Sequence, residues 1–140
     1  MKFPLRAETV IPHRAGMCCI DSLLSITPQQ VTACVTLHPQ HLLLTASGML
    51  DRSGFIELAA QAACGLKGAS AKGRQDAAIA LLGGVNNFNV CEDAWVNQTL
   101  MIYVTISGEV AKLSLLDFRI ECESRLLASG ELRVFYQAET

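Results

Sequence analysis

Residues 52–68 restrict the fold of this chain most, because small and apolar side chains recur there at helical spacing. Phe55, Leu58, Ala62 and Leu66 follow one another at intervals of three or four residues, which predicts an α-helix. Alanine and glycine occupy six of the other thirteen positions, so other segments can approach this helix from most of its circumference. A helix on an open sheet needs small side chains on one face only. We therefore expect a strongly curved sheet that encloses the helix.

This helix carries one carboxylate, Glu57, in an otherwise apolar or small-residue run apart from Gln61. Gln61 follows Glu57 at i+4, so the two side chains share a face and the amide can orient the carboxylate. The helix dipole stabilises an acid near the helix N-terminus by only about 0.3–1 kcal/mol. A buried, unpaired charge costs several kcal/mol. Glu57 therefore needs a partner, a proton or solvent, unless it is an ordinary exposed helix residue.

The rest of the chain is predicted as strands and turns. Residues 17–26 and 30–39 read as strands before the helix, which Asp51 or Ser53 can cap and Gly68 can end. We therefore expect an α+β fold in one domain, residues 1–140, with the helix wrapped by a curved antiparallel sheet of about six strands, the hot-dog arrangement. Four further segments after the helix read as strands: 77–90 (one long strand or two, with a bulge at Gly83–Gly84), 98–111, 113–124 and 126–137.

Composition excludes several classes of function. A net charge of −2 over 140 residues gives no reason to expect a nucleic-acid or anionic-membrane partner. No apolar run approaches the roughly 20 residues that span a bilayer, and the first residues lack the apolar core of a signal peptide, so we expect a cytoplasmic protein. The six cysteines form neither a CxxC motif nor a cluster with histidine. They are expected to be buried, reduced thiols, without a metal site.

Two motifs resemble those of a known family. "IPHRAGMCCID" (11–21) resembles the opening of the hot-dog 3-hydroxyacyl-[acyl-carrier-protein] dehydratases, and "GFIELAAQAACGLKG" (54–68) resembles their helix signature, with Glu and Gln four residues apart. The aryl-polyene-type (ApeP-like) branch is more similar, because it has a histidine about fifteen residues before the helix glutamate; His41 lies sixteen residues before Glu57. The "GHFP" loop of bacterial fatty-acid dehydratases is absent. Segments 81–84 ("LLGG") and 130–137 ("GELRVFYQ") also resemble this branch.

The resemblance implies elimination of water from a 3-hydroxyacyl thioester, carried by acyl carrier protein or coenzyme A, to give a 2-enoyl thioester. It implies that His41 takes the C2 proton and that Glu57 holds or protonates the leaving hydroxyl. Backbone N–H groups around Gly54, at the helix N-terminus, would bind the thioester carbonyl. Neither a metal nor a redox cofactor is implied.

Several alternatives stay open. In this family the histidine and the acid of one site usually come from different protomers, which implies a homodimer or a hot-dog heterodimer. The missing "GHFP" loop favours a second possibility, a non-catalytic or half-site subunit of such a heterodimer. A third is an acyl thioesterase, in which the helix acid activates water. His41 is alternatively a solvent-exposed loop residue, and His38 then a candidate for the working histidine. Acyl chain length and the identity of the carrier do not follow from the sequence.

Overall fold

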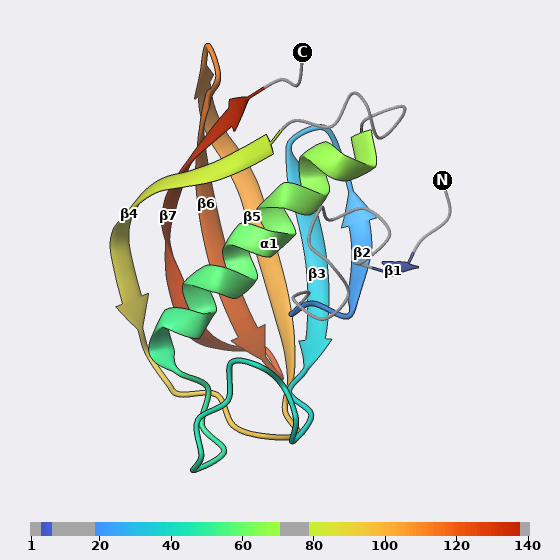
Figure 1. The fold of residues 1–140 in the computed structure, drawn as a ribbon, viewed down its shortest axis with the longest axis vertical. Helices are drawn as coiled ribbons and strands as arrows, with labels where there is room; N and C mark the ends of the chain where they lie inside the picture. The colour runs from blue at the N-terminus through green and yellow to red at the C-terminus, as the bar shows by residue number, and fades with distance from the viewer. Residues whose placement is uncertain (1–3, 7–18, 71–78, 138–140) are drawn as a thin grey trace.

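The computed structural model describes residues 4–6, 19–70 and 79–137 of the chain. In this part of the chain one helix packs against a seven-stranded sheet of order β1-β2-β3-β5-β6-β7-β4, in which all neighbours are antiparallel (Figure 1). The elements are β1 (Leu5–Arg6), β2 (Ser22–Ile26), β3 (Gln30–Thr36), α1 (Arg52–Ser70), β4 (Ile79–Val90), β5 (Thr99–Val110), β6 (Leu113–Cys122) and β7 (Arg125–Gln137).

The sheet curves around α1, which runs diagonally across its concave face (Figure 1). The helix side chains facing the sheet have no exposed surface, among them Phe55, Leu58, Ala59 and Ala62. The alanines among them let the backbone of α1 lie close to the strands, and α1 contacts β2, β3, β4, β5 and β6. The predicted α+β hot-dog fold is confirmed, and the short β1 raises the strand number from about six to seven.

The predicted strands agree with the structure in type and differ at their ends. Residues 77–90 give one strand, β4, whose pairing with β7 shifts between Leu82 and Gly84, as the predicted bulge requires. A second irregularity includes Asn87, whose φ of 54° lies in the left-handed region. The helix continues to Ser70 and so passes Gly68, its expected end. The first residues of the predicted strand 17–26 lie outside the described residues.

One expectation about buried side chains was wrong in part. The cysteines were expected to be buried, but Cys91 is exposed and Cys34 and Cys64 are only partly buried. Cys91 follows the last residue of the edge strand β4, where no further strand covers it. Trp95, a large aromatic residue that often lies in a core, is 46% exposed, so it is not a core residue of this chain.

Candidate active site

Asp51, one of the two residues that the sequence offered as a cap, caps the N-terminus of α1. Its Oδ1 accepts hydrogen bonds from the backbone N–H of Ser53 (3.0 Å) and from the Ser53 hydroxyl (2.9 Å). The Gly54 N–H donates to the backbone carbonyl of Asp51 at 2.7 Å. The cap therefore satisfies donors of the first turn that would otherwise lack a partner.

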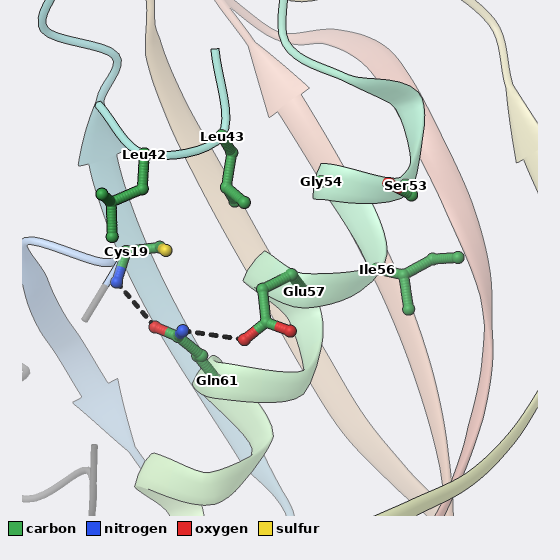
Figure 2. A pocket seen from close by; sticks show the side chains of 8 residues that line it. All are labelled: Cys19, Leu42, Leu43, Ser53, Gly54, Ile56, Glu57 and Gln61. Atoms are coloured by element: carbon green, nitrogen blue, oxygen red, sulfur yellow. Dashed lines mark hydrogen bonds between the residues drawn. The ribbon is translucent and has the colours of Figure 1, made fainter. Parts of the chain in front are cut away.

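A cavity of about 490 Å³ opens beside the first two turns of α1 (Figure 2). Its walls come from the helix, from the loop between β3 and α1, and from Cys19 just before β2. Leu42, Leu43 and Ile56 make the lining mostly apolar, and the carboxylate of Glu57 lies between them. An apolar cavity with one carboxylate suits a ligand with an apolar chain and one polar centre.

Gln61 joins the carboxylate to the segment before β2. Its side-chain Nε2 donates to Glu57 Oε2 at 2.8 Å, and its Oε1 accepts the backbone N–H of Cys19 at 2.7 Å (Figure 2). Gln61 is only 1% exposed and Cys19 6%, whereas Glu57 is partly buried. The predicted i+4 contact is thus present, and Glu57 has the partner that its apolar surroundings require. The alternative of Glu57 as an exposed helix residue is wrong.

His41 is bonded to main-chain groups of two residues that line the cavity. Its Nε2 is 2.9 Å from the backbone carbonyl of Cys19, and its Nδ1 accepts the backbone N–H of Leu43 at 3.1 Å. Its chain neighbours Leu42 and Leu43 line the cavity, whereas His41 is not among the described residues that do. His41 is partly buried, so the alternative of a solvent-exposed loop histidine is wrong. His38, the other candidate, is exposed.

Gly54 lies in the cavity wall and is buried. A Cβ at this position would come within 2.9 Å of Leu50 Cδ1 and 3.4 Å of Leu43 Cβ, so glycine allows the loop to pack onto the helix start. Its N–H is already bonded to Asp51. A thioester oxygen can therefore use this donor only by sharing or replacing that hydrogen bond, and the expected carbonyl-binding role of Gly54 stays a prediction.

The thiol of Cys64 lies on α1 two turns after Glu57. Burial, together with the negative charge of Glu57, raises the pKa of Cys64 from its ordinary value of 9.0 to about 11. The thiol therefore keeps its proton at neutral pH and is a weak nucleophile there. Cys64 is therefore a packing residue of α1 and not a reactive group.

Sequence reasoning missed one contributor to the site, the main chain of Cys19. The sequence places this residue in the "MCCID" motif, but a backbone N–H and carbonyl leave no signature in the side-chain pattern. The described residues contain no cluster of three or more His, Cys, Asp or Glu side chains that could hold a metal ion. In the same part of the chain, no helix has the length and apolarity needed to cross a membrane.

A helix enclosed by a curved antiparallel sheet, with a polar centre beside the start of the helix, defines the hot-dog class. Residues 5–140 match the sequence profile of the ApeP-like family, described as ApeP dehydratase. The chain therefore belongs to the ApeP-like dehydratase family, and the resemblance seen in the sequence is confirmed. Among curated proteins no match was found.

Solved structures support the same fold. The dehydratase heterocomplex ApeI:P from Xenorhabdus doucetiae superposes with a TM-score of 0.86 at 21% identity, covering 97% of this chain and 92% of that chain. An uncharacterized protein from Pyrococcus horikoshii gives 0.73 at 12% identity, covering 99% and 97%. A hypothetical thioesterase with coenzyme A from Streptococcus pneumoniae gives 0.65 at 11% identity, covering 84% and 85%.

Proposed function

We propose that this protein removes water from a 3-hydroxyacyl thioester and forms a 2-enoyl thioester. The observation that carries the proposal is Glu57, a carboxylate held by Gln61 in the wall of a mostly apolar cavity at the start of the enclosed helix. Membership in the ApeP-like dehydratase family supports this chemistry. An acyl carrier protein or coenzyme A would carry the substrate.

The elimination requires two proton transfers. A base removes the C2 proton, the C2–H electrons form the double bond to C3, and the C3–O bond breaks. The hydroxyl leaves as water after taking a proton from an acid, the role we assign to Glu57. Gln61 would hold the carboxylate in one orientation so that its second oxygen faces the cavity. The sequence assigned the C2 base to His41, and that assignment is a prediction.

A second chain is part of the proposal. In the described structure β4 pairs with β7 alone and forms one end of the sheet. We propose that this edge joins a second hot-dog chain, whose strands would close the open side of the cavity. The partner is either a second copy of this chain or a different hot-dog protein.

Mass spectrometry tests the activity directly. The purified protein, alone and mixed with a hot-dog partner, is incubated with 3-hydroxyacyl groups of several lengths on acyl carrier protein. We expect loss of one water from the acyl group, and we expect Glu57→Gln to abolish it while the fold is kept. No loss of water with any chain length, alone or with the partner, would contradict the proposal.

Two observations favour other candidates. The similarity to a chain of a dehydratase heterocomplex favours a half-site subunit, which would be inactive alone and would co-purify with a different hot-dog chain. The similarity to a hypothetical thioesterase with coenzyme A favours thioester hydrolysis. Release of free thiol from an acyl-coenzyme A, without loss of water from a 3-hydroxyacyl thioester, would identify the thioesterase.

A further inference from the structure

The cavity beside α1 has two halves of different chemistry. The loop before α1 contributes Leu42 and Leu43, which we call the loop half. The first turn of α1 contributes Ser53 and Gly54, which we call the helix half. The side chain of Glu57 lies next to both halves (Figure 2).

The difference favours one orientation of a thioester ligand. The helix half lies at a helix start, where backbone N–H groups and the positive end of the dipole suit a carbonyl oxygen. The loop half consists of two leucines, which suit the part of an acyl group that has no polar atoms. With C3 at Glu57, the thioester end of the ligand then lies at the helix half and the acyl tail at the loop half.

Leu42 is the most exposed side chain of the loop half. It is 58% exposed, whereas Leu43 is partly buried and packs against the hydrophobic core. Removal of apolar surface from water is favourable in proportion to the area removed. An acyl tail that ends before the loop half leaves Leu42 in water, and a longer tail covers it. Leu42 therefore favours long acyl chains over short ones.

We infer that Leu42 is a specificity-determining residue, which binds the acyl tail and makes the site select straight apolar acyl groups longer than butyryl. This inference rests on the proposed function, because the position of C3 at Glu57 sets where the tail begins. The tail does not react, so its contact with Leu42 is the same in the substrate and in the transition state. Leu42 therefore affects KM and leaves kcat unchanged.

Ile56 provides the contrast to Leu42 in the same cavity. It is a partly buried residue of α1 that lines the cavity, and it lies on the opposite side of Glu57 from Leu42 (Figure 2). In the inferred orientation Ile56 contacts the thioester end of the ligand. Acyl groups of every length share this end, so Ile56 does not distinguish them.

Thioesters of pantetheine, the arm common to acyl carrier protein and coenzyme A, test the inference. The 3-hydroxybutyryl and 3-hydroxyoctanoyl thioesters differ only in the tail. We expect Leu42→Ala to raise KM for the octanoyl substrate by about five- to twentyfold, with kcat unchanged. Both constants for the butyryl substrate should stay as in wild type. An equal rise in KM for the two substrates, or a fall in kcat alone, would overturn the inference.

Two further variants serve as controls. Ile56→Ala also removes apolar surface from the cavity, and we expect it to change KM for both substrates by the same factor. Leu126→Ala, at a 40% exposed position of β7 outside the described lining of the cavity, is expected to behave as wild type. Length dependence in Ile56→Ala and not in Leu42→Ala would place the ligand in the opposite orientation, and the inference would be wrong.

The competing explanation for the exposure of Leu42 is a contact with a second chain. Such a contact would make Leu42→Ala weaken the dimer and change the activity with both substrates to the same extent. Since Leu42 is exposed, its replacement should cost the fold little. We expect light scattering to show the wild-type dimer in Leu42→Ala. A weakened dimer with an unchanged ratio of the two KM values would overturn the inference.

Binding of thioethers separates this inference from the proposed function, because a thioether can be neither dehydrated nor hydrolysed. Isothermal titration calorimetry compares S-butyl-pantetheine with S-octyl-pantetheine. We expect wild type to bind the octyl compound about tenfold or more tightly, Leu42→Ala to reduce this preference, and Ile56→Ala to keep it. Equal affinity of wild type for the two compounds would overturn the inference. If wild type shows the preference but removes no water, the proposed function fails and the role of Leu42 stands.

Discussion

At the scale of single residues, the central fact is how Glu57 is accommodated. The sequence left three possibilities for a carboxylate in this helix: a partner, a proton or solvent. The structure gives it a partner, because the buried amide of Gln61 donates to it at 2.8 Å. Glu57 is thus held in one place by an amide and not by an ion pair with any of the described residues.

Gln61→Leu tests this arrangement. The variant removes the acceptor of the Cys19 N–H and the donor to Glu57, and an unsatisfied buried polar group costs about 1–3 kcal/mol. We expect the free energy of unfolding, measured with urea, to fall by that amount, together with a loss of activity. Gln29→Leu, at an exposed position, is the control and is expected to stay within about 0.5 kcal/mol of wild type. Equal stability of the two variants would contradict the prediction.

Cys64 gives a prediction about pH. Its pKa is raised to about 11 by burial and by the charge of Glu57, so alkylation by iodoacetamide at pH 8 is expected to be much slower at Cys64 than at the exposed Cys91. Peptide mapping by mass spectrometry measures both rates. In Glu57→Gln the pKa of Cys64 should fall and its alkylation should speed up.

The same shift has a consequence for stability. The folded thiol keeps its proton to a higher pH than the unfolded one, whose pKa is 9.0. This contribution to stability is complete below about pH 9 and is lost as the pH rises through about 11. Alkylation of Cys64 as fast as that of Cys91 in the native protein would contradict this account.

At the scale of the elements, small residues decide how closely the strands and the helix approach. The ring of Phe118 on β6 lies over Gly130 on β7 and packs against Phe88, with ring centroids 6.3 Å apart. The sequence predicted residues 113–124 and 126–137 as strands, but it did not predict that Gly130 makes room for the ring of Phe118. Phe118 and Gly130 face each other across β6 and β7 only because of the register in which these two strands pair.

Gly130→Ala tests this contact. Its Cβ would lie 2.8 Å from Phe118 Cε2 and 3.3 Å from the backbone of Phe88, so the ring must move within a packed core. We expect a loss of about 1–3 kcal/mol in the free energy of unfolding. Gly84→Ala in the neighbouring strand is the control, because the nearest atom to its Cβ is 3.9 Å away. If both variants unfold at the same urea concentration, the contact does not restrict residue 130.

At the scale of the whole molecule, the sheet does not close on itself. It ends at β1 on one side and at β4 on the other. In the described part of the chain, no strand pairs with the outer edge of β4 (Figure 1). Unpaired edge strands are usually covered, or they become sites of association. The cavity beside α1 and the edge of β4 thus both point to an assembly of two chains.

We predict that the active particle is a dimer. Light scattering should give twice the mass of one chain, or the mass of one chain plus a hot-dog partner. The activity per chain should fall on dilution in parallel with the dimer fraction, because in our proposal the second chain would close the cavity. Full activity of a monomer at every concentration would contradict this prediction.

The sequence by itself determined the class of fold, since helical spacing and small side chains in residues 52–68 leave few ways to pack strands around them. It also determined the pairing of Glu57 with Gln61, because residues at i and i+4 share a helix face whatever surrounds them. Only the tertiary structure decided which groups the imidazole of His41 contacts. Its hydrogen-bond partners are main-chain groups of Cys19 and Leu43, and the folding of two distant segments, not the identity of any side chain, brings the first of them to the ring.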